Sequence, residues 1–504
     1  MKSVAAVLMI ISALSKILGF LREMVFSYFF GTGITKDAYV IATAIPTILA
    51  GFVGTALTIG NIPIYTRENK KGREWGDLFT SRIANLIFVI VTLFVIAVLV
   101  YPEGVVKLIA GGYEGEVLKL TIQYMRIMIF SLYAISLFSL YQGYLNANDS
   151  FVLSALAPFS MNAVIILFTI AAGMVDKIYL PLGFIVSYFV QFMFIVPGLK
   201  KLHYSYRLSF SIKDESVKDF IRLALPMMMA LIVSNIANLI DNNIASYLTP
   251  GGVSALDYSY RIIGIVTGIL IFPITTAIYP TMSKMGTQGQ IPELKKIITE
   301  NSTTISILNV PSIIGLIVLS RPIISAIYGR GAFGEESVLM TSTVLIYYAP
   351  MLIGMGITDI YNRAFYSLQD TKTPVIVSSI SMIADIVLNF LLSSIMGLSG
   401  LALSSSIGRV VNAVLLMWVL RMRIGKLGLK IFVHKFIIIA AASIIMGIFA
   451  YVFNDFAASA MNPMLGLMLT IIFSTALYFS ILSVMKVISI QEIIIKAVRF
   501  KKKK

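Results

Sequence analysis

Residues 15–39, SKILGFLREMVFSYFFGTGITKDAY, join two apolar segments through a glycine-containing turn and carry charges at a depth where a membrane helix should have none. The first segment starts near Met1 and ends at the turn 31–33, which places Lys16, Arg22 and Glu23 close to its middle. An ionisable residue at that depth costs roughly 2.5–3.5 kcal/mol on insertion scales, so it marks a functional site by default.

Helix geometry sorts these charges into two neighbouring stripes. Ser15, Gly19 and Arg22 fall on one stripe, and Lys16 and Glu23 fall on the adjacent one. The first helix therefore presents two cations and one carboxylate to the interior of a helix bundle. The alternative is an Arg22–Glu23 or Lys16–Glu23 pair that only holds helices together.

The composition excludes a soluble globular protein and a disordered one. Of 504 residues, 58% are hydrophobic and 13% are charged, and the mean hydropathy is +0.90. The chain has no cysteine and two histidines, which excludes disulfides, zinc sites and catalysis by Cys or His nucleophiles. The opening MKSVAAVLMIISAL resembles a signal peptide, but it lacks a convincing cleavage site, so we interpret it as a retained membrane helix.

Apolar segments of spanning length predict an all-α polytopic membrane protein with fourteen helices. The predicted helices are 3–30, 37–65, 78–101, 118–145, 151–173, 179–199, 217–248, 253–281, 302–321, 337–366, 374–396, 400–421, 433–453 and 464–486. Basic residues cluster after every second helix, whereas the other loops carry only scattered cations, among them Lys36. The positive-inside rule then places both termini in the cytoplasm. The terminal lysines lie beside a membrane helix, which argues against nucleic-acid binding.

Similar segments recur about 220 residues apart and predict two parallel repeats of six helices. Asp37-Ala38-Tyr39 opens the second predicted helix, and Asp257-Tyr258 lies near the start of the eighth. Residues 141–149 and 361–370 close the fourth and tenth helices in a similar way. An offset of six helices preserves orientation, and transporters commonly bind substrate between such repeats. The predicted organisation is an N-lobe (1–200), a cytoplasmic linker (201–216), a C-lobe (217–421), two additional helices (422–486) and a basic tail (487–504).

Polar residues inside three predicted helices suggest a cation site. Asp241 lies in the seventh helix, Asp385 and Asn389 lie one turn apart in the eleventh, and Ser405 lies early in the twelfth. Their hard oxygen ligands suit Na⁺, and a carboxylate of this kind also carries a proton. The alternative is ordinary hydrogen bonding between helices.

Arg261 extends the cationic character of the predicted cavity. It follows Asp257 at i, i+4 spacing, so the two residues form a helical ion pair in the simplest interpretation. The repeat places their helix opposite the second one, across a central cavity from Lys16 and Arg22. Arginine binds phosphate oxygens with two parallel hydrogen bonds. These cations between hydrophobic bundles predict an anionic, amphipathic substrate. We find no catalytic constellation and no phosphate-cradling P-loop, so we expect no enzyme.

Several motifs together resemble the MurJ (MviN) lipid II flippase family of the multidrug/oligosaccharidyl-lipid/polysaccharide (MOP) exporter superfamily. They begin with the stretches 15–23 and 31–39. The others are 240–246 (IDNNIAS), 255–261 (ALDYSYR), 328–333 (YGRGAF) and 363–374 (RAFYSLQDTKTP). The resemblance extends over essentially the whole chain, including the last two helices.

The resemblance implies a MATE-like fold of two lobes and fourteen helices in the bacterial inner membrane. It implies translocation of lipid II, an undecaprenyl-pyrophosphate-linked disaccharide peptide, from the inner to the outer leaflet by alternating access. The family's cavity arginines fall on Arg22 and Arg261, with Lys16 at a further basic position, and its acidic residue after the first turn falls on Asp37. The last two helices would hold the lipid tail in a groove.

The resemblance also implies a sodium site formed by Asp241, Asp385, Asn389 and Ser405, so Na⁺ is the only cofactor we expect. One departure concerns the second helix, where many members have basic residues after a proline. Here Pro46 is followed by TILAG, so a basic residue is missing near Ala50 and a clamp of three arginines is in doubt.

Three alternatives stay open from the sequence. The first is a flippase for another polyprenyl-linked glycan, such as an O-antigen or capsule unit. The second is an ion-coupled exporter of cationic drugs, which the cationic cavity and the two additional helices disfavour. The third is an inactive scaffold that binds cell-wall synthesis proteins. The driving force, as Na⁺, H⁺ or membrane potential, is also open.

Overall fold

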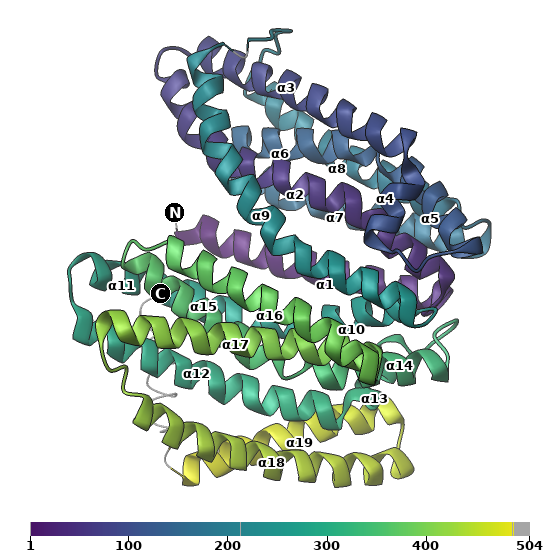
Figure 1. The fold of residues 1–504 in the computed structure, drawn as a ribbon, viewed down its shortest axis with the longest axis vertical. Coiled ribbons are helices and arrows are strands. Elements are labelled where there is room, and N and C mark those ends of the chain that lie inside the picture. Colours follow the sequence, from purple (N-terminus) through teal and green to yellow (C-terminus); the bar gives the residue numbers. More distant parts are fainter. Residues whose placement is uncertain (1, 212, 486, 488–504) are drawn as a thin grey trace. The chain divides into compact units, whose positions relative to one another are not determined.

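The computed structural model of the chain describes residues 2–211, 213–485 and 487, and these residues form helices joined by short connections without any strand (Figure 1). The first half contains α1 (Lys2–Phe30), α2 (Ile34–Asn69), α3 (Arg73–Val100), α4 (Pro102–Ile109), α5 (Gly115–Met128), α6 (Ser131–Ala147), α7 (Phe151–Met174), α8 (Tyr179–Lys201) and α9 (Glu215–Leu248). The second half contains α10 (Gly252–Val266), the π-helix η1 (Thr267–Ile271), α11 (Phe272–Thr287), α12 (Ile291–Val318), α13 (Ser320–Tyr328), α14 (Glu335–Tyr348), α15 (Met351–Ser367), α16 (Lys372–Met396), α17 (Leu398–Ile424), α18 (Leu429–Ala460) and α19 (Pro463–Val484).

These helices confirm the predicted polytopic membrane fold. In the described part of the chain, nine segments are long and apolar enough to cross a membrane, and the bent pairs α5–α6 and α14–α15 each qualify as one further span. Helices α1, α2 and α9 contain 29, 36 and 34 residues, more than the roughly 20 that a bilayer requires. The described residues thus give nine to eleven candidate spans, and the predicted count of fourteen, which would also include α1, α2 and α9, stays a prediction. The predicted basic tail lies outside the described residues except for residue 487.

The internal repeat is visible in features that we did not predict from the sequence. Each half contains one short helix, α4 or α13, which is followed by a bent pair. The bend is 43° between α5 and α6 and 42° between α14 and α15. Helices of eight and nine residues are too short to span a bilayer, which is why hydropathy alone missed them. The same sequence of elements therefore occurs twice along the chain.

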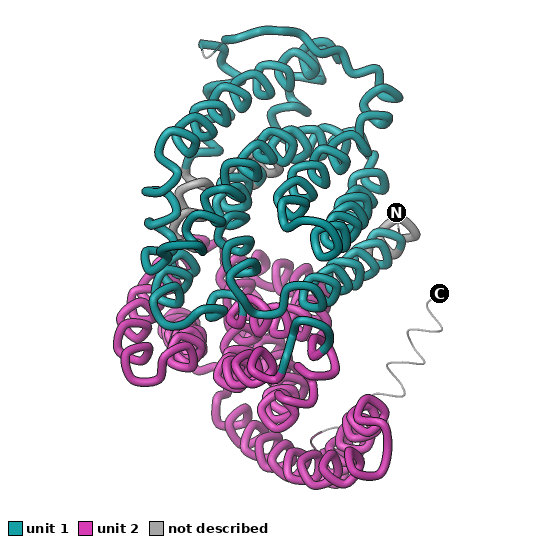
Figure 2. Tube along the Cα trace, turned by 90° about the vertical axis from the view of Figure 1, so that its right-hand side faces the viewer, with its two compact units in different colours: residues 1–254, 330–334 teal, residues 255–329, 335–504 magenta. Residues whose placement is uncertain are grey.

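The chain divides into two compact units, shown in teal and magenta in Figure 2. Unit 1 contains residues 1–254 and 330–334, and unit 2 contains residues 255–329 and 335–504. Helix α9 therefore groups with the helices before it by its contacts. The lobe boundary at residue 217 follows the sequence repeat rather than contacts, and it stays a prediction.

Helix α2 is the centre of unit 1. It packs against α5, α6 and α9, and α1 packs against α7. Ala38, Ile41 and Ala42 are completely buried and recur at the i, i+3, i+4 spacing of one helix face. Small side chains on this face allow close approach between membrane helices, where van der Waals contact drives association.

Helix α12 has the corresponding central place in unit 2, where it packs against α15 and α18. The two additional helices, α18 and α19, attach to it through a core of buried residues: Val310, Ile439, Ala442, Met446, Tyr478 and Leu482. The Tyr478 hydroxyl also donates a hydrogen bond of 2.8 Å to the carbonyl of Ile307. The two additional helices are therefore part of the packed unit.

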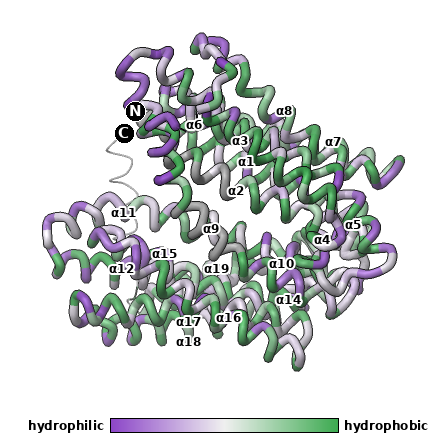
Figure 3. The backbone as a smooth tube through the Cα atoms, turned by 45° about the horizontal axis from the view of Figure 1, so that its top comes forward, coloured by the Kyte–Doolittle hydropathy of each residue, from purple (hydrophilic) through white to green (hydrophobic). Residues whose placement is uncertain are grey.

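Hydropathy follows the helices as a membrane protein requires. Hydrophobic residues colour most of α7, α8 and α18, whereas hydrophilic residues gather in connections between helices (Figure 3). Large apolar side chains such as Leu167 and Ile448 are more than 60% exposed along these helices. Exposed apolar surface of this kind is the surface that lipid covers.

The turn between α1 and α2 requires glycine at one position, and this gives a prediction. Gly31 has φ +54°, and a Cβ there would lie 2.4 Å from the carbonyl oxygen of Ala332. We expect Gly31→Ala to destabilise the protein by roughly 1–3 kcal/mol, because left-handed backbone and steric overlap both penalise a side chain. Thermal unfolding of the purified protein in detergent would measure the change.

Gly33→Ala is the matched control in the same turn. Gly33 has an extended backbone with φ −167°, and the nearest atom to its Cβ position is the Phe30 carbonyl oxygen at 3.9 Å. We expect this variant to unfold like the parent chain. Equal destabilisation by the two variants would contradict the steric explanation.

Candidate functional site

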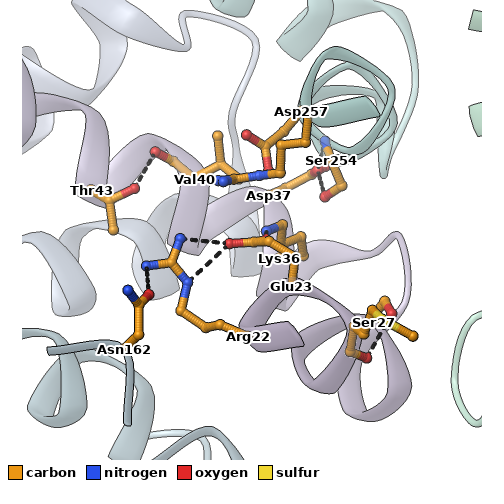
Figure 4. A network of polar contacts seen from close by, with 12 residues as sticks. Arg22, Glu23, Ser27, Lys36, Asp37, Val40, Thr43, Asn162, Ser254 and Asp257 are labelled. Carbon is orange, nitrogen blue, oxygen red and sulfur yellow. Dashed lines mark hydrogen bonds and ion pairs between the residues drawn. The ribbon is translucent and has the colours of Figure 1, made fainter. Parts of the chain in front are cut away.

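Arg22 and Glu23 of α1 form a largely buried polar network in unit 1 (Figure 4). The Arg22 guanidinium donates to Glu23 Oε1 from Nε at 3.2 Å and from Nη2 at 2.9 Å. Its Nη1 donates to Oδ1 of Asn162 on α7 at 3.2 Å. The Glu23 side chain is 6% exposed and that of Arg22 is 20% exposed. The guanidinium is therefore held by two helices but still reaches the surface.

Lys36 completes this network from the first turn of α2. Its ammonium group lies 3.0 Å from Glu23 Oε2 and 4.4 Å from the centre of the Phe26 ring, and its side chain is 1% exposed. The sequence-based interpretation of Lys36 as a scattered loop charge is therefore wrong. The helix begins at Ile34, three residues earlier than predicted, and the short turn directs Lys36 inward toward Glu23.

A lysine at this position requires compensation. The N-terminus of a helix carries partial positive charge, so a cation in its first turn is disfavoured. Lysine is also almost never fully buried unless it is paired. The carboxylate of Glu23 and the electron-rich face of Phe26 supply that compensation. Glu23 thus bonds one cation with each of its two oxygens.

Asp37, next along α2, binds the start of another helix. Its Oδ2 accepts a hydrogen bond of 2.7 Å from the Gly251 amide, and its Oδ1 accepts one of 2.8 Å from the Ser254 amide. The Ser254 hydroxyl also donates to Oδ1. Asp37 therefore caps the first turn of α10, where the amides lack partners within the helix.

The remaining candidates on α1, Ser15 and Lys16, lie about two turns before Arg22. Ser15 is partly buried, and Lys16 is exposed. A Cβ at Gly19 would lie 3.8 Å from Asn162 Oδ1, so Gly19 and Arg22 both face α7. The structure confirms this part of the predicted stripe. The roles of Ser15 and Lys16 in binding stay predictions.

Arg261 belongs to unit 2 and has a local partner. Its Nε donates to Asp257 Oδ2 at 2.9 Å, one turn earlier on α10. The Arg261 side chain is 35% exposed and that of Asp257 is 21% exposed. The simple helical ion pair therefore exists. A cavity shared by Arg261 and Arg22 stays a prediction, because the two residues belong to different units.

The two helices α16 and α17 bring part of the candidate cation site together. Asn389 accepts a hydrogen bond from the Ser404 hydroxyl, so the contact involves the serine before the predicted Ser405. A Cβ at Gly408 would lie 3.1 Å from Asp385 Oδ1, which shows that α17 packs directly against this carboxylate. The buried Asp385 Oδ1 has no hydrogen-bond partner among the described residues. Asp241 lies on α9 in unit 1.

Two members of the network, Asn162 and Lys36, escaped the sequence analysis. Asn162 is one amide in the middle of an apolar helix, 140 residues from Arg22, and only folding joins them. Lys36 had a weak sequence signal. It stands beside Asp37 and thirteen residues after Glu23, across a turn that reverses the chain.

Comparison with known proteins identifies one family over most of the chain. The family model described as "Lipid II flippase MurJ" matches residues 26–484. A probable lipid II flippase MurJ of Bdellovibrio bacteriovorus is 26% identical over 480 residues, which cover 93% of this chain and 91% of the relative. A probable lipid II flippase MurJ of Thermotoga maritima is 28% identical over 439 residues, covering 86% of each.

Solved structures give the same result. A lipid II flippase MurJ in an inward closed conformation has a TM-score of 0.83 and 27% sequence identity, and the match covers 95% of this chain and 98% of that chain. An inward-facing multidrug resistance MATE family transporter of the MOP superfamily has a TM-score of 0.71 and 16% identity, covering 84% and 98%. The second comparison shows a shared fold.

Proposed function

Because the chain belongs to the lipid II flippase MurJ family, we propose that it moves lipid II from the inner to the outer leaflet of the bacterial inner membrane. The observation that supports this most strongly is the match over residues 26–484, which extends from the first helix through α19. The chain has many apolar candidate spans, and the charged network of α1 and α2 supplies polar groups that could bind a charged head group. We propose alternating access between the two halves as the mechanism.

We propose that Arg22 binds the pyrophosphate of the head group. A guanidinium has five N–H groups, and three of them donate to Glu23 and Asn162 in the described part of the chain. One N–H on each terminal nitrogen is left to donate, which suits two phosphate oxygens. We propose that Lys16 and Arg261 contribute further positive charge to substrate binding, and Ser15 a hydroxyl. Glu23 and Asp37 would position the cations and the start of α10.

The transport cycle needs no change in the bonds of the substrate, so we propose a transporter and no enzyme. Lipid II enters and leaves with its pyrophosphate, sugars and peptide intact. Its polyprenyl tail would stay in the membrane against the groove of α18 and α19. We further propose that both termini are cytoplasmic, since the basic loops follow every second span. Membrane lipids and cell-wall synthesis proteins are the other partners we propose.

We propose that a cation couples transport to an ion gradient through Asp241, Asp385, Asn389 and Ser405. The buried Asp385 Oδ1 without a hydrogen-bond partner among the described residues fits a cation ligand, because burying an uncompensated carboxylate oxygen is costly. Carboxylate, amide and hydroxyl oxygens are suitable ligands for Na⁺. The bound cation would neutralise the carboxylate and favour one conformation.

Asp385→Asn tests this coupling. It keeps the size of the side chain and removes its charge, so we expect slower flipping together with loss of its dependence on the Na⁺ gradient. Flipping assayed in vesicles with and without an imposed gradient would measure this. Ser394→Ala, near the end of the same helix, is the control, because the Ser394 hydroxyl donates only to its own helix among the described residues. An Asp385→Asn variant that still responds to Na⁺ would contradict the site.

The other functions considered from the sequence are not favoured by these comparisons. A flippase for another polyprenyl-linked glycan and an exporter of cationic drugs have no support beyond the shared MATE-like fold. A scaffold without transport differs from the proposal in a measurable way, because it would not move lipid II.

The decisive experiment is complementation. A bacterial strain depleted of its own lipid II flippase would receive the intact gene, with membrane expression checked by immunoblot. Growth with normal cell shape would support the proposal. Lysis despite full membrane expression would contradict it, and a direct assay of lipid II exposure at the outer leaflet would then distinguish a scaffold from a transporter of another glycan.

A further inference from the structure

The connection between α8 and α9 lies along α3 in an extended conformation. Residues 205–211, here called the linker strap, have no helical structure. The Ser205 amide donates to Asp77 Oδ2 at 3.1 Å, and the Arg207 amide donates to Ser81 Oγ at 3.2 Å. The Ser209 carbonyl accepts from Asn85 Nδ2 at 2.9 Å. The main chain of the linker strap therefore binds three polar side chains of α3.

These contacts are in register because two repeat lengths match. Asp77, Ser81 and Asn85 are four residues apart, which is about 6 Å per step along a helix. Alternate residues of an extended chain are about 6.6 Å apart. Residues 205, 207 and 209 of the linker strap therefore each hydrogen-bond a polar side chain one turn farther along α3. The linker is held in place over two turns of the helix.

An ion pair between Arg82 of α3 and Asp214 holds the chain just after the linker strap. Arg82 donates from Nη1 to Asp214 Oδ2 at 2.5 Å and from Nε to Ser209 Oγ at 3.3 Å. Partial burial would raise the pKa of Asp214, but the Ser216 hydrogen bonds and the Arg82 charge outweigh it and lower the pKa. The Asp214 carboxylate is therefore ionised at neutral pH and pairs with Arg82.

The outer side of the linker strap is apolar and exposed. Leu208 and Phe210, at alternating positions, are 76% and 63% exposed. The Tyr206 ring is 52% exposed, but its hydroxyl donates to Asn85 Oδ1 on α3. The side of α3 that binds the strap is polar up to Asn85. Farther along the helix the same side carries the apolar residues Phe88 and Ile96, which are 55% and 50% exposed. Since α3 spans the membrane, this face meets lipid beyond the strap. The strap thus covers the end of a lipid-facing surface and extends it with its own apolar side chains.

The depth of the linker strap follows from the length of α3. A helix needs about 20 residues to cross the hydrocarbon core. If the core ends at Val100, the last residue of α3, it begins near Ser81, because residues 81–100 make up 20 residues. Residues 207–210, which lie against Ser81 to Asn85, are therefore at the level where the hydrocarbon begins. The chain segments next to the start of α3 and the linker strap are rich in cations: Arg67, Lys70, Lys71, Arg73, Lys200, Lys201, Arg207 and Lys213. Three of them are paired with carboxylates, Arg67 with Asp219, Lys71 with Glu68 and Arg207 with Glu74. Such cations attract the anionic lipids of the cytoplasmic leaflet.

We propose that the linker strap is an interfacial anchor that binds anionic phospholipid of the cytoplasmic leaflet. Leu208 and Phe210 insert at the boundary between headgroups and acyl chains, and the neighbouring cations contact the headgroup phosphates. Tyr206 holds the strap to α3 through its hydrogen bond to Asn85. The anchor fixes the connection between α8 and α9 at the membrane surface. This inference rests on membrane insertion with the proposed cytoplasmic termini, and it does not depend on the transported substrate.

Site-directed spin labelling tests the anchor. Because the chain has no cysteine, a single introduced cysteine is the only labelling site. Leu208→Cys and Phe210→Cys would each carry a nitroxide in the full chain, reconstituted into vesicles with anionic or with only zwitterionic lipid. Gln288→Cys, in the exposed connection between α11 and α12, is the control. Collision with oxygen and with a water-soluble nickel complex measures depth. Thermal unfolding verifies that each labelled variant is folded.

We expect the labels at 208 and 210 to lie roughly 5–10 Å below the lipid phosphates in anionic vesicles, and the control label to lie in water. We also expect a shallower position in zwitterionic vesicles. Labels at 208 and 210 that react with nickel like the control would overturn the proposal. Equal depth in both lipids would overturn the assignment of anionic lipid. Spin–spin broadening that disappears on dilution with unlabelled protein would identify a second copy as the occupant instead.

Discussion

Arg22→Ala will fail to rescue a strain depleted of its own lipid II flippase, whereas the intact chain will rescue it. The guanidinium is fixed by Glu23 and Asn162 and keeps one N–H on each terminal nitrogen for the head group. Removing one partner of a charged, desolvated contact typically costs 2–5 kcal/mol, or roughly 30- to 5,000-fold in binding. Colony counts under depletion, at equal membrane expression, measure the effect.

Two further variants make this result specific. Arg22→Lys keeps the charge but loses the planar pair of donors, so we expect partial rescue. Arg321→Ala removes an arginine from an exposed pair with Glu335, in which the side chains are 64% and 77% exposed, and it should rescue like the intact chain. If Arg22→Ala rescues fully, the function stands and the account of head-group binding is wrong.

Lys36→Met is expected to destabilise unit 1 strongly. It leaves Glu23 buried with one oxygen no longer bonded to the Lys36 ammonium, and breaking a buried ion pair from one side costs roughly 3–5 kcal/mol. The double variant Glu23→Gln/Lys36→Met removes both charges of that pair and should recover most of the loss. Thermal or denaturant unfolding in detergent would give the free energies for a double-mutant cycle.

The control for this cycle is Lys107→Met, which removes a lysine from an exposed i, i+4 pair with Glu103. We expect no measurable change in its unfolding. Glu23→Gln alone completes the cycle. If the loss of stability in the double variant equals the sum of the losses in Glu23→Gln and Lys36→Met, the Lys36–Glu23 contact contributes little, and Lys36 stabilises the helix turn in another way. Complementation by the double variant would then show whether Arg22 needs the carboxylate for its position.

The polytopic membrane fold and the repeat were predictable because hydropathy over about 20 residues is a local property of the chain. The charges of α1 were recognisable for the same reason, since any ionisable residue in such a segment stands out. Asp37 was assigned through the family resemblance, but its bonds to Gly251 and Ser254 link residues more than 210 positions apart. No local pattern predicts such a pairing.

The sequence alone determined that this chain is a polytopic membrane protein with a cationic first helix and two similar halves. Only the tertiary structure decided which groups these charges meet: Asn162 and Lys36 for the network of Arg22 and Glu23, and α3 for the linker strap. The physical reason is that desolvation requires every buried charge and polar main-chain group to find a partner. The sequence shows that a partner is needed, but packing of distant helices determines which residue provides it.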